Sequence, residues 1–139
     1  MQNLKKEKSC GAVVYKIEEN EVLFLLVQQK AGHYGFPKGH VEENETEEET
    51  ATREIKEETN LDVKLNTNFR VVTTYYPISN VIKDVVFFIA TPISNNIIAQ
   101  QEEIANIIWC DYKNALKKLT HQDNKNILEA ALKFIKNNN

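Results

Sequence analysis

The feature that most constrains this chain is a dense acidic segment between Glu42 and Glu58. It holds nine glutamates against two basic residues, Arg53 and Lys56, so its net charge is −7, while the other 122 residues carry a net charge of +4. Acidic runs in general form solvated charged faces. The internal spacing of this one indicates a more specific arrangement.

A helix is predicted over about residues 46–59. Thr46 and Glu49 stand at the spacing of a capping box, in which each side chain binds the backbone N–H of the other residue. Asn60 follows the predicted helix, and asparagine can adopt the left-handed conformation that ends many helices. The acidic segment is therefore expected to lie on one defined helix.

Two stripes run along this predicted helix, where successive residues are about 100° apart. Ala51 and Ile55 form an apolar stripe, which must pack against the rest of the protein. Glu54, Glu57 and Glu58 form a second stripe beside it, and three carboxylates within one turn repel one another. A bound cation would relieve this repulsion, and oxygen ligands without His or Cys suit magnesium or manganese ahead of zinc. A solvated face is the alternative.

Strand-like segments surround the predicted helix. Residues 9–17 and 21–29 predict a β-hairpin, and residues 30–40, with three of the four glycines and one proline, predict a shaped loop. The remaining expected elements are strands at 62–65, 68–76, 82–91 and 104–111 and a final amphipathic helix over about 124–135. Strands on both sides of a helix, followed by a terminal helix, predict a mixed sheet that is covered on both faces.

Length and composition suit one soluble domain over residues 1–139, with a disordered tail at 137–139. The chain is 42% hydrophobic and 27% charged, which is typical of a globular protein with a single core. No apolar run is longer than residues 22–27, which are too few to cross a bilayer, and the N-terminus lacks the apolar core of a secretory signal. We therefore expect a cytoplasmic monomer with no membrane partner, in which Cys10 and Cys110 are free thiols.

Residues 39–61 resemble the Nudix box, GX5EX7REUXEEXGU. The matching positions are Gly39, Glu45 and the run 53–61. The one departure is Asn60, where the family has glycine, and because asparagine tolerates the same backbone conformation we expect a small stability cost and intact chemistry. The resemblance implies an α/β fold, an αβα sandwich with a mixed sheet, a metal-binding helix and a C-terminal helix.

The resemblance also implies an activity, the hydrolysis of a pyrophosphate bond in a nucleotide-like substrate with magnesium, which manganese can replace. The metal would hold the charged phosphate oxygens and lower the pKa of a bound water. The residues that the resemblance assigns are Glu54, Glu57, Glu58 and the main-chain carbonyl of Lys38 for the metal, and Gly39, Glu45 and Arg53 for its support.

In the family that the box resembles, the general base that takes the proton of the attacking water lies either within the box or in a later loop. We expect Glu57 or Glu54 of the box to take this role. In a later loop, Glu103 is the candidate, because it lies just before the strand expected at 104–111. For Glu103, an exposed acid without a catalytic role is the alternative.

Residues outside the box resemble the diadenosine tetraphosphate hydrolase branch of the family. This resemblance rests on residues 35–42 (GFPKGHVE), on residues 9–11 (SCG) and on Trp109. It implies asymmetric hydrolysis of a dinucleoside tetraphosphate, in which Tyr76 stacks on adenine and Lys83 binds phosphate. An ordinary aromatic residue at a strand end and a solvated lysine on an edge strand are the alternatives.

Two residues of the shaped loop complete the expected substrate site. Lys38 is expected to bind phosphate beside the metal-binding helix. His33 is expected to line the substrate cleft, and a solvated loop histidine is the alternative.

Other functions use the same motif. Within the family, the chain could remove pyrophosphate from the 5′ end of RNA or from an ordinary or damaged nucleoside triphosphate. A nucleic-acid partner has little support, since no compact run of basic and aromatic residues is present. From another class, the chain could be a non-catalytic nucleotide sensor, but a sensor is free to lose carboxylates and this chain retains all of them.

Overall fold

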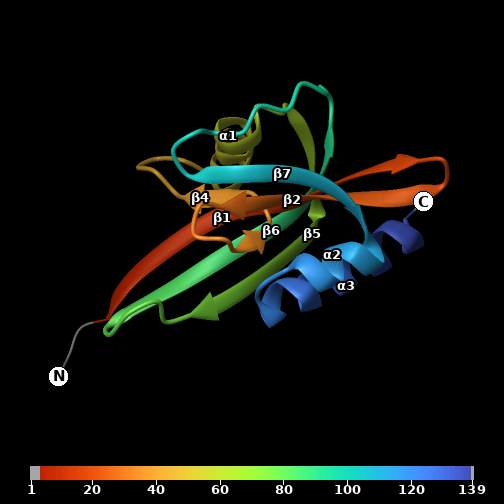
Figure 1. Cartoon of the computed structure of the whole chain (residues 1–139). Coiled ribbons are helices and arrows are strands. Elements are labelled where there is room, and N and C mark those ends of the chain that lie inside the picture. The colour runs from red at the N-terminus through yellow and green to blue at the C-terminus, as the bar shows by residue number, and fades with distance from the viewer. Residues whose placement is uncertain (1–3, 139) are drawn as a thin grey trace.

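A mixed β-sheet separates two helical layers in the computed structural model, which describes residues 4–138 (Figure 1). The strands are β1 (Lys5–Glu18), β2 (Glu21–Gln29), β3 (Tyr34–Gly35), β4 (Lys38–His40), β5 (Val63–Tyr75), β6 (Val81–Pro92) and β7 (Ile104–Asp111). The helices are α1 (Glu47–Thr59), α2 (Tyr112–Lys118) and α3 (Gln122–Asn137). The expected αβα sandwich with a mixed sheet and a C-terminal helix is confirmed.

The centre of the sheet is a long parallel pair. β1 and β6 run side by side from the pair Lys5–Val81 to the pair Val14–Ala90, while β2 and β5 flank them as antiparallel neighbours. β7 extends the sheet beyond β2, and β4 pairs with β1 over residues 9–11. Because β4 lies directly before the segment that leads to α1, this pairing brings the shaped loop next to that helix.

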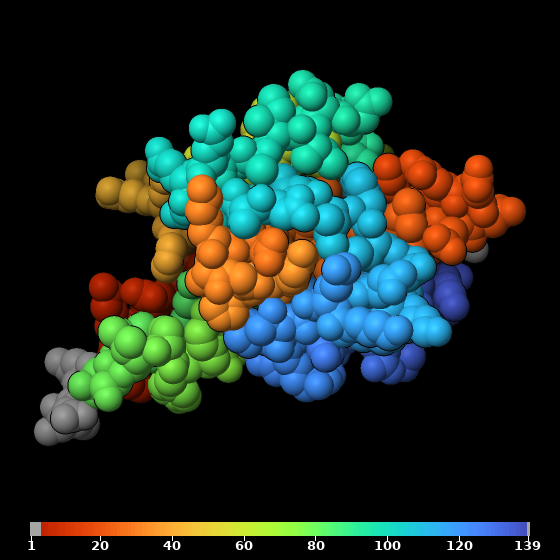
Figure 2. Space-filling model, in the orientation of Figure 1, coloured from red at the N-terminus to blue at the C-terminus, as the bar shows by residue number. Residues whose placement is uncertain are grey.

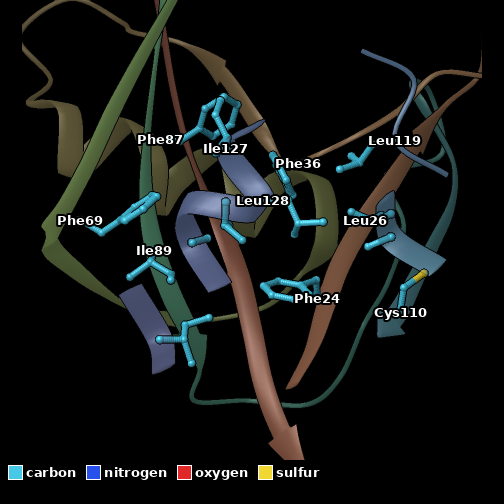
Figure 3. Packing of buried hydrophobic residues seen from close by; sticks show 14 of the residues in the cluster. Phe24, Leu26, Phe36, Phe69, Phe87, Ile89, Cys110, Leu119, Ile127 and Leu128 are labelled. Carbon is cyan, nitrogen blue, oxygen red and sulfur yellow. The ribbon is translucent and has the colours of Figure 1, made fainter. Parts of the chain in front are cut away.

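Alternate residues of the central strands face two separate cores. On β1, Val13 faces the layer of α2 and α3, and Val14 faces the layer of α1. Figure 3 shows the first core, in which Phe24, Phe36 and Ile89 surround Leu128 of α3. Successive side chains of a strand point to opposite faces, so a sheet that is covered on both faces needs continuous apolar strands.

The predicted ends of α1 are confirmed. Thr46 caps the helix through its hydroxyl, which accepts a hydrogen bond from the Glu49 N–H at 3.1 Å, and the Glu49 carboxylate accepts one from the Thr46 N–H at 2.9 Å. Asn60 ends the helix with φ 67° and ψ 2°, in the left-handed region. Ala51 and Ile55 are fully buried, as the apolar stripe requires.

Several elements differ from those that the sequence indicates. β5 is one strand rather than two, because a shift of register between Asn66 and Val71 lets both segments pair with β6. The expected loop at 30–40 contains the short strands β3 and β4. α2 was not expected, because a helix of seven residues is too short to show an amphipathic repeat.

The chain end and the cysteines can also be compared with expectation. Of the expected disordered tail, Asn137 is the last residue of α3, Asn138 is the C-cap that follows it, and Asn139 lies outside the described residues. Cys10 and Cys110 are free thiols, as expected, and both are buried. None of the helices described is both long and apolar enough to cross a membrane.

Candidate active site

A cleft of about 770 Å³ is lined by residues of the sheet and of both helical layers. Its lining comes from α1, from the segment 33–42, from the β6–β7 loop, from β5 and β6, and from the first turn of α3. Figure 2 shows this side of the molecule, where the orange segment from β2 to β4 lies between the cyan β7 region and the blue helix α3, beside the green β5–β6 turn. The cleft therefore gathers residues that are far apart in the sequence.

Three glutamates of α1 line one part of this cleft, as the helical spacing predicts: Glu54, Glu57 and Glu58. Glu58 is 5% exposed, and its Oε1 has no hydrogen-bond partner among residues 4–138. Burial and the neighbouring charge of Glu54 raise the pKa of Glu58 to about 8. Burial also raises the pKa of Glu54. Buried carboxylates of this kind need a nearby positive charge to remain ionised.

The donor set of α1 fits a hard divalent cation. Its ligands are all carboxylate oxygens, which magnesium prefers, and Glu58 offers a buried oxygen that is not already hydrogen-bonded. Within the described part of the chain, no three acidic, histidine or cysteine side chains converge on one point. Instead, Arg53 Nη1 binds Glu54 Oε1 at 2.8 Å and Glu57 Oε1 at 3.2 Å. A bound cation would share with Arg53 the neutralisation of the negative charge on Glu54 and Glu57.

Arg53 also joins α1 to the loop before it. Its Nε donates to Glu45 Oε2 at 2.6 Å, and its Nη2 donates to Glu45 Oε1 and to the main-chain carbonyl of His40, each at 2.9 Å. Hydrogen bonds from Arg53 and from the Glu42 backbone lower the pKa of Glu45 to about 2. The predicted pair of Glu45 and Arg53 is thus a bidentate ion pair, the geometry that orients both partners best.

Gly39 lets β4 pack closely against α1. A Cβ atom at this position would overlap the carboxylate of Glu54. The preceding residue, Lys38, lies close to Glu58. The ammonium charge of Lys38 and a hydrogen bond from the Lys38 backbone both lower the pKa of Glu58 and so oppose the effect of burial. Lys38 therefore lies beside α1, while its contact with phosphate and the metal contact of its main-chain carbonyl stay predictions.

Lys83 lies in the floor of the cleft, on β6. It is 8% exposed, and burial together with the charge of Lys38 lowers the pKa of its ammonium group. No acidic side chain of residues 4–138 forms a salt bridge with it. A buried ammonium group without a carboxylate partner is suited to an anionic ligand such as a polyphosphate.

The structure places Tyr75, rather than Tyr76, in the cleft. Tyr76 is 65% exposed and is not part of the lining. Tyr75 lines the cleft and is the register partner of Lys83 across β5 and β6. Residues paired across two strands present their side chains to the same face of the sheet, so Tyr75 shares the face of Lys83, while Tyr76 lies beyond the end of β5.

His33 lines the cleft as expected, and α3 adds residues that the sequence did not indicate. His33 stacks on His121, with ring centroids 5.6 Å apart and an interplanar angle of 15°. Asp123 and Asn124 also line the cleft, and the Thr73 hydroxyl donates to Asp123 Oδ2 at 3.0 Å. No local motif marks these residues, since only the packing of α3 against β5 brings them to the site.

Glu103 lies in the cleft with the glutamates of α1. Its charge contributes to the raised pKa of both Glu54 and Glu58. The Lys30 N–H donates to the Glu103 carbonyl at 2.9 Å, and the Ile104 N–H donates to the Gln100 carbonyl at 3.0 Å. Glu103 is an exposed residue of this lining, and its role as the base stays a prediction.

Comparisons with known proteins identify related sequences and structures. A model of the NUDIX domain matches residues 5–131. The asymmetrical bis(5′-nucleosyl)-tetraphosphatase of Caenorhabditis elegans is 28% identical over 132 residues, which are 92% of this chain and 96% of that protein.

Solved structures extend the likeness to three dimensions. A C. elegans Ap4A hydrolase binary complex has a TM-score of 0.86 at 26% identity and covers 94% of this chain and 98% of its own. The NUDIX domain of Shewanella oneidensis NrtR, complexed with ADP ribose, shares the fold, with a TM-score of 0.76 at 18% identity and coverage of 97% and 90%.

Proposed function

The chain belongs to the Nudix family, whose model spans most of it, and from that premise we propose that it hydrolyses diadenosine tetraphosphate asymmetrically to ATP and AMP. It is a hydrolase of phosphoric anhydride bonds, and Nudix hydrolases generally use divalent metal ions. The observation that carries the finer proposal is the match to an asymmetrical tetraphosphatase over 92% of this chain and 96% of the relative. Magnesium is the metal that we propose.

The lining of the cleft supports a polyphosphate substrate that carries two bases. Its volume of about 770 Å³ lies in the usual range for small-molecule sites. Lys38 and Lys83 supply positive charge for phosphate groups. Tyr75 and the stacked pair of His33 and His121 offer ring faces to nucleobases, and such stacking tolerates any base.

In this proposal Glu54, Glu57 and Glu58, with the main-chain carbonyl of Lys38, hold the magnesium ion. When bound, the ion stabilises the charge of the phosphate oxygens and acidifies a water molecule. Arg53 orients Glu54 and Glu57 through its Nη1 hydrogen bonds. The ion pair with Glu45 in turn fixes Arg53.

We assign the general base to Glu103, with Glu57 and then Glu54 as the alternatives within the box. Glu54 and Glu57 already accept hydrogen bonds from Arg53, and both belong to the proposed metal ligands. Glu103 lies close to them in the same cleft. A carboxylate that is not a metal ligand keeps its basicity. The base must also lie within hydrogen-bond reach of the attacking water.

A substrate panel with magnesium tests this function. The panel is diadenosine tetraphosphate, 8-oxo-dGTP, ADP-ribose and 5′-triphosphorylated RNA, each assayed for products and for kcat/KM. We expect the highest kcat/KM with diadenosine tetraphosphate, and ATP and AMP in equal amounts. A higher value with another substrate would refute the dinucleotide assignment and leave the Nudix hydrolase, and no turnover on any substrate would favour a nucleotide sensor.

A further inference from the structure

We propose that Asn60 is a positioning residue, whose side-chain amide holds the β6–β7 loop so that Glu103 faces the glutamates of α1. Asn60 stands where the Nudix box has glycine. The inference deepens the proposed function, since it rests on Glu103 as the base. It concerns how the site is assembled, whichever phosphoric anhydride is the preferred substrate.

The side chain of Asn60 makes a contact that glycine cannot make. Its Nδ2 donates to the main-chain carbonyl of Asn96 at 2.9 Å. Its backbone adopts φ 67°, which either asparagine or glycine can supply. The need to end the helix therefore explains the backbone conformation at this position. It does not explain the side-chain amide, which instead binds the β6–β7 loop.

The β6–β7 loop runs along the C-terminal end of α1 and is hydrogen-bonded to it at several residues. Beside the contact of Asn60, the Ile98 N–H donates to the Thr59 carbonyl at 3.0 Å, and the Gln100 N–H donates to the Glu58 carbonyl at 3.2 Å. In Figure 1 this loop arches past the end of α1 before it enters β7. Three consecutive residues of the box, 58–60, thus each bind the loop that carries Glu103.

A short turn at residues 101–103 connects the part of the loop that contacts α1 to Glu103. The Ile104 N–H donates to the Gln100 carbonyl at 3.0 Å, so residues 100–104 form one hydrogen-bonded turn. The Gln100 N–H binds the Glu58 carbonyl. Gln100 also lines the cleft, and its side-chain Oε1 is buried. A loop released at Asn96 loses part of what holds this turn against α1, and Glu103 then leaves its place beside Glu54 and Glu58. Small errors in the placement of a base reduce turnover more than binding.

The test replaces Asn60 by the residue of the family, in Asn60→Gly. Asn80→Gly is the matched control, because Asn80 has a similar φ of 65° and lies in the β5–β6 turn. Hydrogen exchange of the Ile98 and Gln100 amides is expected to accelerate in Asn60→Gly and not in Asn80→Gly. Loss of one neutral hydrogen bond corresponds to a fall in kcat of about threefold to tenfold. KM is expected to change by less than about twofold, since the substrate contacts remain.

A double-mutant cycle with Glu103→Gln decides whether the effect passes through the base. If it does, Asn60→Gly causes no further loss of kcat in the Glu103→Gln background. An equal loss in both backgrounds, a Glu103→Gln enzyme with wild-type turnover, or unchanged exchange at Ile98 and Gln100 would each overturn the proposal. The assays use the panel substrate that the wild type hydrolyses fastest. A preference for a substrate other than diadenosine tetraphosphate would therefore refute the proposed function and leave the inference about Asn60 standing.

Discussion

Gly39→Ala tests the packing of β4 against α1, the helix that carries the proposed metal ligands. The added Cβ would occupy the space of the Glu54 carboxylate. Two responses relieve the overlap. Either the Glu54 side chain turns away from the cleft, or β4 moves away from α1 and carries Lys38 with it.

Both responses have calculable consequences. If β4 moves, overpacking costs about 1–3 kcal/mol of unfolding free energy, which for a chain of this size lowers Tm by roughly 4–12 °C. If Glu54 turns away, it loses its 2.8 Å hydrogen bond with Arg53 and its place among the proposed metal ligands. Misplacement of one such group by about 1 Å can cost about a hundredfold in turnover. We therefore expect kcat to fall by about two orders of magnitude in either case.

Thermal unfolding and steady-state kinetics with magnesium measure the two effects. Gly35→Ala is the control for stability, because a Cβ there would meet only the Asn124 side-chain amide, at 3.4 Å. We expect that control to change the unfolding free energy by less than about 0.5 kcal/mol. A Gly39→Ala protein with wild-type Tm and wild-type kcat would refute the reasoning, since it would show that Glu54 does not need to lie against β4.

Three further predictions concern single side chains. Glu57→Gln is expected to reduce kcat by orders of magnitude while circular dichroism shows an intact fold, and near-normal turnover would remove Glu57 from the mechanism. Tyr75→Ala is expected to raise KM more than it lowers kcat, whereas Tyr76→Ala leaves KM unchanged; the reverse result in steady-state kinetics would restore Tyr76 as the stacking residue. The hydrogen bond from Arg70 lowers the pKa of Glu47 to about 2, so this carboxylate stabilises the fold above its unfolded pKa near 4.5 and loses that contribution as pH falls toward 2. Glu47→Gln should then lower the unfolding free energy at pH 7 by about 1 kcal/mol, allowing for solvent screening, and urea titrations in which this difference does not shrink below pH 5 would contradict the pairing.

The features that could be predicted from the sequence are those with local signals. The capping box of Thr46 and Glu49, the left-handed Asn60 and the buried stripe of Ala51 and Ile55 depend on residues within one helix, and all three are observed. The box glutamates follow from the same local periodicity. Their ion pairs with Arg53 are equally local, because Glu57 lies one turn along α1.

Features that depend on pairing between distant segments were not predicted. The sequence contains adjacent tyrosines, and only the register of β5 with β6 shows that Tyr75 faces the cleft. His121 and Asp123 reach the site because α3 packs across the sheet, and nothing in their own neighbourhood indicates it. Asn60 was expected to replace glycine at a small stability cost and with intact chemistry, and its hydrogen bond to Asn96 was not predicted because Asn96 is 36 residues away in the chain.

The central claim is that the glutamates of α1 form a divalent-metal site. Calorimetric titration of magnesium and of manganese into the wild type, Glu58→Gln and Glu48→Gln tests it most directly. Glu48 is the matched control, because it is an exposed glutamate of the same helix and does not line the cleft. We predict that Glu58→Gln weakens metal binding by at least about tenfold, since it removes a ligand charge, while Glu48→Gln binds like the wild type. Equal affinity in all three proteins would contradict the account.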